Sequence, residues 1–577
     1  MVDDNNKNVL VVLAEQGLIK GESQISDITQ QLDGGATLDQ VLVETDLVEP
    51  EALAKVRAQV AGLPYVDLRE KQIPKNVLDI IPESTARGHM IIAYEQTDNV
   101  VRVAMSDPSD RQIVEFIRKK VDRPVEVGVA SAGAVRNTLG NYQESLEAEL
   151  DDVVSKELKL VNEIVNDLGK AAEDLPIVRI TQAILKHAIV EGASDIHIEP
   201  TDKDVIIRYR VDGILHDMLV LPRAVLAGLV ARIKVLSNLK IDEHRLPQDG
   251  RFMIESDEYK VAFRVSTLPV FDGEKVVMRL LDESGKKLSL DDIGIRPAAL
   301  ELMRRIIKRP HGMVLVTGPT GSGKTTTLYA AMKEVNTADV NISTIEDPVE
   351  YRMPRINQTQ VKPQIGLTFA NGLRALVRQD PDVIMVGEIR DEETASLAIN
   401  AALTGHLVLT TLHTNSAAGA IPRMRDMKVE AFLLASTVNL IMAQRLVRKL
   451  CVKCRKERKL DAQVIGEIKK EFNSEEIFKT LVREKVVKEG SGWKDVVIYQ
   501  AVGCKRCHDG YKGRIGIYET MEITPEIQKM IKPSVTAEQI EQAARENDGM
   551  VSMLEDGIIK TVEGTTTLEE VLRVARE

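Results

Sequence analysis

The 577-residue sequence is poor in aromatic side chains, in cysteine and in long apolar runs. Aromatic residues make up only 3% of the chain, so it lacks the stacking platforms with which proteins bind single-stranded nucleic acid. No apolar run approaches the roughly 20 residues of a membrane-spanning helix. The polar start at residues 1–8 has no signal-peptide core. We therefore expect the protein to work in the cytoplasm and to reach a membrane only through partners.

The sequence also lacks a strong excess of charge of either sign. The chain has 76 Lys and Arg against 88 Asp and Glu, a formal net charge of −12. This balance argues against a broad surface contact with nucleic-acid phosphates. The hydrophobic content of 44% and charged content of 28% are ordinary for a globular protein. The length suggests about three or four domains.

The few cysteines are not placed at random. They form two C-x-x-C pairs, Cys451 with Cys454 and Cys504 with Cys507. In a reducing compartment such pairs favour a tetrahedral zinc site over disulfides, although unrelated thiols or a redox dithiol are alternatives. Residues 455–503 separate the pairs, a wider gap than in the usual zinc ribbon. Four thiolates complete the shell without His508, so the predicted zinc is structural.

A phosphate-binding loop is the most specific motif of the chain. It matches G-x-x-x-x-G-K-[ST] without a mismatch, between a predicted strand at residues 311–317 and a predicted helix at residues 326–335. Its backbone N–H groups and the helix N-terminus suit a phosphate. We expect Lys324 to reach the β- and γ-phosphates of ATP and Thr325 to hold Mg²⁺. The predicted nucleotide-binding residues are Gly318, Pro319, Thr320, Gly321, Ser322, Gly323, Lys324, Thr325 and Thr326.

Three polar clusters follow the loop, each at the end of a predicted strand. Glu346 ends a β-branched run, and Glu388 ends a Walker B-like strand in which Gly387 replaces the usual aspartate. His413 follows the strand predicted over residues 407–412. In a doubly wound sheet the carboxyl ends of the strands form the ligand site. We therefore predict that Glu388 and Glu346 orient or activate water and that His413 senses the γ-phosphate.

Composition and hydrophobic periodicity divide the chain into five parts. We predict a small helical unit at 1–62, an α/β domain at 63–145, an acidic linker at 146–175, a second α/β domain at 176–291 and a phosphate-loop domain at 292–577. The last includes the zinc module, residues 451–507, and C-terminal helices. Asp212 and Gly213 predict a hairpin turn in the second α/β domain.

Together these motifs resemble those of the type II/type IV secretion superfamily of ATPases, in the GspE/PilB branch. That branch drives type II secretion and type IV pilus extension. Its Walker A motif, Asp box, atypical Walker B motif and His box match residues 318–325, 344–350, 383–388 and 405–413. Its zinc element matches the two cysteine pairs, and residues 564–573 are also typical. The resemblance runs from about residue 67 to the end.

The resemblance implies an α/β fold with a RecA-like P-loop ATPase domain and an inserted zinc module. A PAS-like α/β domain would precede the ATPase domain, after an N-terminal small helical plus α/β domain. It also implies a homohexamer, with ATP at the subunit boundary and arginines supplied by the PAS-like domain. The candidates are Arg208, Arg210, Arg264 and Arg279. A guanidinium fork pairs phosphate oxygens and keeps its charge; for each arginine the alternative is a place on an exposed sheet face.

The resemblance further implies a Mg²⁺-dependent ATP-hydrolysing motor for type IV pilus assembly. It would lie peripheral to the inner membrane, held by a platform protein there. The wide gap between the cysteine pairs favours pilus assembly, and type II secretion is the alternative. A nucleic-acid motor would draw on the basic stretch at residues 445–459, which the acidic balance opposes. Glu388 and Lys324 argue against a scaffold that binds nucleotide without hydrolysing it.

The amino-terminal unit resembles a small helical domain that binds cyclic di-GMP in some relatives. Those relatives use repeated Arg-Leu-Gly-x-x-Leu motifs. The matching places here, residues 8–13 and 36–42, lack the arginine and the glycine. The sequence therefore argues against a cyclic di-GMP site.

Overall fold

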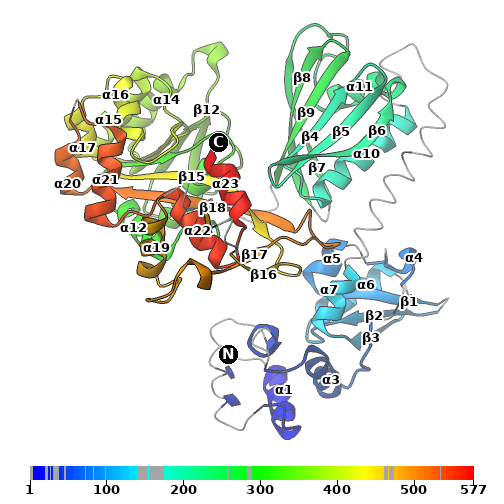
Figure 1. Cartoon of the computed structure of the whole chain (residues 1–577). Coiled ribbons are helices and arrows are strands. Elements are labelled where there is room, and N and C mark those ends of the chain that lie inside the picture. The colour runs from blue at the N-terminus through cyan, green and yellow to red at the C-terminus, as the bar shows by residue number, and fades with distance from the viewer. Residues whose placement is uncertain are drawn as a thin grey trace. The chain divides into compact units, whose positions relative to one another are not determined.

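The structure is a computed structural model that forms two compact units, Met1–Asp282 and Glu283–Glu577 (Figure 1). It describes residues 4–19, 24–25, 28–29, 38–43, 47–69, 71, 73–78, 80–81, 83–97, 99–121, 123–139, 154, 174–256, 259–282, 289–460, 465–466, 473–532 and 534–576. Apart from positions 154, 174 and 175, the linker predicted over residues 146–175 lies outside these ranges. No helix within the described ranges is long and apolar enough to span a membrane.

The first unit begins with short helices, α1 (Asp4–Glu15), a π-helical turn (Asp39–Val43) and α3 (Pro50–Ala61). Pro50 suits the first turn of α3, and Gly62 ends the helix with a φ angle of 66°. Apolar residues of these segments, including Leu10 and Leu53, form one buried cluster.

A small α/β element follows the helices. Its strands are β1 (Ile91–Gln96), β2 (Val101–Met105) and β3 (Val125–Val129), and its helices are α4 (Lys75–Leu78), α5 (Glu83–Gly88), α6 (Arg111–Val121) and α7 (Ala132–Leu139). Strand β2 pairs antiparallel with β1 and parallel with β3. Helix α3 is tied to this element because Arg57 donates a hydrogen bond to the backbone oxygen of Ser106.

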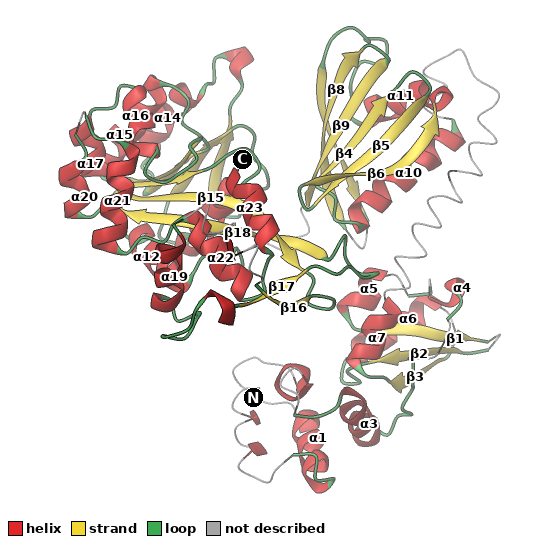
Figure 2. Cartoon of the chain, viewed as in Figure 1, coloured by secondary structure: helices red, strands yellow, loops and turns green. Residues whose placement is uncertain are grey.

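The rest of the first unit is an antiparallel sheet with the strand order β6-β5-β4-β9-β8-β7. Its elements are α10 (Leu175–Val190), β4 (Asp195–Pro200), β5 (Asp204–Val211), β6 (Ile214–Pro222), a 3₁₀ turn (Arg223–Val225), α11 (Leu226–Leu236), β7 (Gln248–Glu255), β8 (Lys260–Val270) and β9 (Gly273–Asp282). Asp212 and Gly213 form the predicted hairpin turn with φ angles of 49° and 92°. Helices α10 and α11 share an apolar core with one sheet face (Figure 2).

The second unit is built on a sheet with the strand order β12-β11-β13-β14-β10-β15-β18, parallel except for β18. The strands are β10 (Gly312–Thr317), β11 (Ile342–Glu346), β12 (Ile356–Gln360), β13 (Val383–Val386), β14 (Leu407–Leu412), β15 (Val438–Leu450) and β18 (Tyr511–Glu522). Every residue of β10 and β14 is buried. Such continuous apolar runs are expected of parallel strands covered on both faces.

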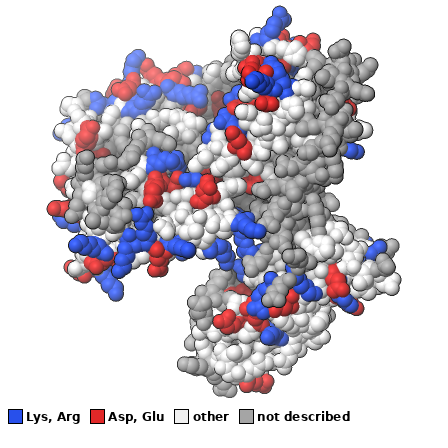
Figure 3. Space-filling view, turned by 45° about the vertical axis from the view of Figure 1, so that its right-hand side comes forward, with Lys and Arg blue, Asp and Glu red and all other residues white. Residues whose placement is uncertain are grey.

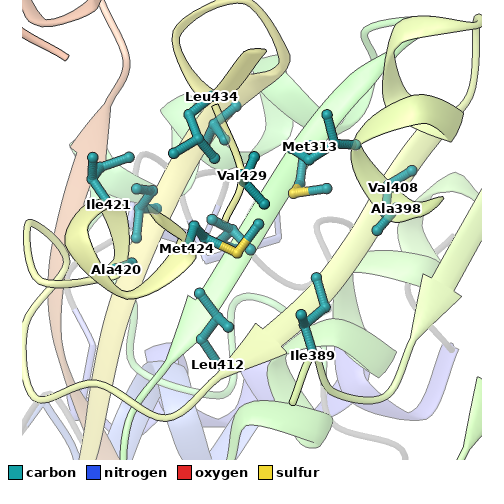
Figure 4. Packing of buried hydrophobic residues seen from close by; sticks show 14 of the residues in the cluster. Met313, Ile389, Ala398, Val408, Leu412, Ala420, Ile421, Met424, Val429 and Leu434 are labelled. Atoms are coloured by element: carbon teal, nitrogen blue, oxygen red, sulfur yellow. The ribbon is translucent and has the colours of Figure 1, made fainter. Parts of the chain in front are cut away.

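Helices pack on both faces of this sheet. They are α12 (Pro297–Ile307), α13 (Lys324–Val335), α14 (Phe369–Leu376), α15 (Glu392–Leu403), α16 (Ala420–Asp426) and α17 (Ala431–Thr437), with 3₁₀ turns at Pro363–Ile365 and Val377–Gln379. One core lies between β10, β14 and the helices α15 to α17; Figure 4 shows Met313 and Leu412 of the strands beside Met424 and Leu434 of the helices. The fold thus places the carboxyl ends of β10, β11, β13 and β14 at one edge of the sheet.

The zinc module and the C-terminal helices complete the second unit. They contain β16 (Lys456–Lys459), α19 (Ser474–Arg483), a 3₁₀ turn (Trp493–Asp495), β17 (Val497–Gln500), α20 (Pro525–Met530), α21 (Ala537–Asp548), α22 (Met553–Val562) and α23 (Leu568–Arg576). The helical tail is three helices, since Gly549 and Gly564 have φ angles of 65° and 73°.

Acidic and basic side chains lie side by side on the face in Figure 3, as the mixed charge of the sequence suggests.

Candidate functional site

The phosphate loop joins the carboxyl end of β10 to the first turn of α13. Gly318, Gly321 and Gly323 have φ angles of 148°, 79° and 87°, which non-glycine residues rarely adopt. Close packing adds a second constraint at Gly318, where a Cβ would lie 2.3 Å from the backbone oxygen of Gln444. The glycines of the motif are therefore required by backbone geometry as well as by access to a phosphate.

Lys324 lies within the curve of this loop. Its Nζ donates hydrogen bonds to the backbone oxygens of Gly318, at 2.8 Å, and Pro319, at 3.0 Å. Burial lowers the pKa of Lys324 from 10.5 to about 8, an effect that the nearby Glu388 carboxylate partly offsets. Thr325 and Thr326 are half-buried in the first turn of α13. Lys324 thus lies inside the phosphate loop, and Thr325 follows it in the first turn of α13.

The predicted catalytic side chains follow the neighbouring strands. Glu346, Glu388 and His413 lie at the carboxyl ends of β11, β13 and β14, which are consecutive in the sheet and lead to β10. Nε2 of His413 is 3.3 Å from Oε2 of Glu388, and Arg390 forms an ion pair with the other carboxylate oxygen. The Glu388 side chain is 12% exposed and that of His413 47%. Glu388 and His413 therefore form one cluster beside the phosphate loop.

Glu346 has a different environment from Glu388. It is 2% exposed, and it accepts hydrogen bonds from Tyr329 and Thr344 and, at 3.2 Å, from Gln358. Burial raises the pKa of Glu346, and these hydrogen bonds oppose that effect. Glu346 is thus held by α13, β11 and β12, whereas Glu388 faces His413 and the lysine of the loop.

The missing Walker B aspartate has a steric explanation. A Cβ at Gly387 would lie 3.3 Å from both the Cα of Glu346 and the backbone oxygen of Ile345. Contacts at this distance are tight, so a side chain here would require the neighbouring backbone to shift by a few tenths of an ångström. The carboxylate of this strand end comes one residue later, at Glu388.

The sequence patterns did not predict a role for Gln444, which lies on β15, distant in sequence from the phosphate loop. Its Nε2 donates to the backbone oxygen of Ser322 at 2.7 Å, and its Oε1 accepts from Thr327 Oγ1 at 2.7 Å. The buried Gln444 amide thus fastens the phosphate loop to α13. The parallel pairing of β10 with β15 brings it there, and no local motif encodes that pairing.

The predicted arginines lie on the PAS-like sheet of the first unit. Arg208 and Arg210 occupy alternate positions of β5, on the face away from the core. In the strand register Arg210 is opposite Asp195 of β4, Asp195 is opposite Arg279 of β9, and Arg279 is opposite Arg264 of β8. Cross-strand partners share a face, so the structure brings the predicted arginines together on one surface.

Two acids of β4 hold most of these arginines. The buried Asp195 carboxylate is 2.9 Å from Nε of Arg279 and 3.9 Å from Nε of Arg210. Glu199 forms ion pairs with Arg208 and, at 2.7 Å, with Lys275. Arg264 is exposed and forms no ion pair in the part of the chain that the structure describes. Asp195 and Glu199 are four residues apart in β4 and therefore share a face of the strand. That spacing is the sequence signal that would have predicted this arrangement.

The four cysteines meet at one point of the zinc module. Their Sγ atoms all lie within 4.8 Å of one another, at 3.9 Å for Cys451 and Cys504, 3.7 Å for Cys454 and Cys507 and 3.5 Å for Cys504 and Cys507. A tetrahedron with Zn–S bonds of ~2.3 Å has sulfur atoms about 3.8 Å apart. All four thiols are free. The donor set and its spacing fit zinc, so the four predicted cysteines could hold the ion.

The fold and this edge of the sheet define a P-loop ATPase with a glutamate and a histidine beside its phosphate loop. The profile of the Type II/IV secretion system protein family matches residues 170–573, more than half of the chain, so the chain belongs to this family. The profile of the MshEN domain matches residues 61–149. These matches confirm the family and the fold class predicted from the motifs.

Relatives cover nearly the whole chain. It is 38% identical over 569 residues to the type IV pilus assembly ATPase PilB of Myxococcus xanthus, covering 97% of each chain. It is 45% identical over 435 residues to the type II secretion system ATPase E of Vibrio cholerae, covering 75% of this chain and 82% of the relative. The X-ray structure of the Yersinia pseudotuberculosis ATPase DotB shares the fold, with a TM-score of 0.50 at 20% identity over 69% of this chain and 93% of DotB.

Proposed function

We propose that this ATPase is a homohexameric motor that powers type IV pilus assembly. The near-complete match to PilB, over 97% of both chains, supports a motor of this family, and the wide gap between the cysteine pairs favours pilus assembly. It extends through the arginine-bearing sheet, the phosphate loop and the cysteine module, all parts that the motor requires. A relative that shared only the phosphate-loop domain would support ATP hydrolysis but not a motor built from two rigid units.

In the proposed reaction the γ-phosphoryl group of ATP passes to water, and the protein acts mainly by positioning and electrostatics. Lys324 offsets the phosphate charge, and the Thr325 hydroxyl is the protein ligand for Mg²⁺, which neutralises the phosphate oxygens when bound. Glu388 orients the attacking water and accepts its proton. His413, which contacts Glu388, is the proposed sensor of the γ-phosphate. We assign Glu346 a supporting role, because its oxygens are already occupied by hydrogen bonds.

We propose that the arginines act across the subunit boundary. Arg210, Arg264 and Arg279 stand in one row of the PAS-like sheet and present fixed positive charge from a rigid surface. Closure of this surface on a nucleotide would couple hydrolysis to motion between two rigid bodies. Salt bridges to Asp195 and Glu199 would hold the guanidinium groups in register until the site closes.

Type II secretion is the alternative function, because the type II secretion protein E of Xanthomonas campestris is also 38% identical, over 99% of this chain and 98% of its own. Deletion of the gene in the source organism separates the two. Loss of surface pili with normal protein secretion supports pilus assembly. Loss of secreted proteins with normal pili would transfer the motor to type II secretion.

We further propose that the motor works in the cytoplasm, peripheral to the inner membrane, on a platform protein there. Cyclic di-GMP is not part of this proposal, since residues 8–13 and 36–42 lack the arginine and glycine of the motif. Nucleic acid is not a partner either, given the net charge of −12. The test measures ATP turnover by the purified chain. A rise in turnover with a membrane fraction that contains the platform protein, and no rise with DNA, would support the platform protein as partner and exclude nucleic acid.

A further inference from the structure

A buried acid of β18, Glu519, stands outside the site described above. Its side chain is 5% exposed. Met521, two residues along the strand, and Ala443, opposite it on β15, belong to the large apolar cluster. An acid in such surroundings is costly unless its hydrogen bonds are met, so its contacts call for an explanation.

Two backbone groups from distant segments meet this carboxylate. The N–H of Ala417 donates to Oε1 of Glu519 at 2.7 Å, and the N–H of Met553, the first residue of α22, faces the same carboxylate. Ala417 belongs to the turn formed by residues 414–419, between β14 and α16. Glu519 therefore bridges the turn after His413 and the beginning of a C-terminal helix.

The same turn is fastened to the phosphate loop at its other end. The N–H of Thr414 donates to Oγ1 of Thr317 at 2.8 Å, and the two hydroxyls are 2.7 Å apart. Thr317 is the last residue of β10, next to Gly318. Oγ1 of Thr414 donates in turn to the backbone oxygen of Ser416 at 2.9 Å. Hydrogen bonds joined through the Ser416–Ala417 peptide thus connect Thr317, next to the phosphate loop, to Glu519.

We propose that Glu519 is a positioning residue that holds the turn at residues 414–419, and through it His413, in the arrangement needed for ATP hydrolysis. The assignment rests on the proposed role of His413 at the γ-phosphate. It gives the C-terminal helices a direct mechanical link to the nucleotide site, because a shift of α22 pulls on the same carboxylate that holds the turn.

The electrostatics of Glu519 agree with a functional role. Burial raises its pKa to about 7, an effect that Glu541 strengthens and that the Ala417 and Met553 N–H groups and Arg545 oppose. Between its unfolded pKa of about 4.3 and about 7, the native state binds the extra proton, so this group weakens stability as the pH rises through that window.

The test compares Glu519→Gln with Glu522→Gln, which neutralises another acid of β18. Glu522 instead forms an ion pair with Arg305 of α12 at 2.7 Å. We expect Glu519→Gln to lower kcat for ATP at least ~10-fold, because the amide offers one acceptor oxygen where the carboxylate offers two, so its NH₂ group faces one of the two backbone N–H groups. The dissociation constant of a fluorescent ATP analogue and the melting temperature should stay near wild-type values. Glu522→Gln should retain wild-type kcat.

Hydrogen–deuterium exchange supplies a second measurement on the same proteins. In Glu519→Gln the peptide covering residues 414–420 should exchange faster, while the peptide covering α13 should not change. Wild-type kcat in Glu519→Gln, or unchanged exchange at residues 414–420, would overturn the proposal. So would a loss of melting temperature equal in Glu519→Gln and Glu519→Ala, because that is the mark of a structural residue. His413→Ala serves as the reference: if it keeps wild-type kcat, the proposed role of His413 fails whatever Glu519 does.

Discussion

His413 and Glu388 touch across two parallel strands, with Nε2 of the imidazole 3.3 Å from Oε2 of the carboxylate. Residues 389–412 separate them in the chain, but β13 and β14 pair in register, with Val386 opposite Thr410. Arg390 holds the second carboxylate oxygen. One carboxylate oxygen of Glu388 thus faces His413 and the other faces Arg390, and the proposed roles of base and sensor rest on this contact.

The first prediction separates binding from chemistry. Glu388→Gln should still bind Mg²⁺–ATP but hydrolyse it at least ~100-fold more slowly, the loss expected for a positioned base. Lys324→Ala should lose binding and turnover together, because the ammonium meets the phosphates before and during reaction. Phosphate release and equilibrium binding measure the two effects. If Glu388→Gln kept more than about a tenth of wild-type turnover, another residue would be the base.

The second prediction concerns protons taken up when ATP binds. With its pKa lowered to about 8, much of Lys324 is neutral in the free protein at higher pH. Phosphate favours the charged ammonium, so binding at pH ~8.5 should take up a proton and affinity should fall as the pH rises further. Calorimetry in two buffers with different ionisation enthalpies measures the uptake. Lys324→Arg stays charged and should bind ATP without it; equal proton uptake in both proteins would contradict the prediction.

The sequence predicts the phosphate-loop domain well because its signals are local. The loop, its strand and its helix are adjacent in the chain, and the apolar run of β14 begins and ends where the pattern predicts, at Leu407 and Leu412. The two C-x-x-C pairs likewise predict one metal centre. Each of these features depends on residues that are close in sequence or on a donor set that is chemically complete.

What the sequence could not predict depends on pairing between distant strands. Gln444 reaches the phosphate loop only because β15 lies beside β10, and Glu519 reaches Ala417 only because β18 lies beside β15. The donors that bond to Glu346 also come from three separate elements. Periodicity identifies the strands, but their order in the sheet decides which side chains meet.

The third prediction tests whether the arginines act across subunits. Arg210→Ala and Arg279→Ala should each lower turnover while ATP binding by each chain survives, since the phosphate loop is intact. Mixing inactive Lys324→Ala chains with inactive Arg210→Ala chains should restore part of the activity, because mixed rings contain some intact composite sites. Arg223→Ala, which removes an arginine paired with Asp272 at 3.6 Å, is the matched control and should remain active. No rescue in rings shown to be mixed would exclude action in trans.

The last prediction separates the zinc site from catalysis. The Cys451 N–H donates to the backbone oxygen of Gly510, and Leu450 N–H donates to that of Thr565, both at 2.8 Å. The thiolate cluster is thereby tied to the loop between α22 and α23. Because the free energy of metal binding is also free energy of folding, losing a ligand should loosen these helices before it affects nucleotide binding.

We expect Cys451→Ser and Cys507→Ser to lower the zinc content from one ion per chain, to reduce the melting temperature and to promote aggregation. The soluble fraction should still bind ATP, because Lys324 and its loop are held by β10, α13 and β15 rather than by the zinc module. His508→Ala is the matched control: the imidazole is next to Cys507 in sequence, but the cluster consists of the four cysteines, so zinc content should not change. Elemental analysis of the purified proteins is the measurement. A wild-type chain without zinc, or four serine variants as stable as the wild type, would show that the cysteines do not form a structural metal site.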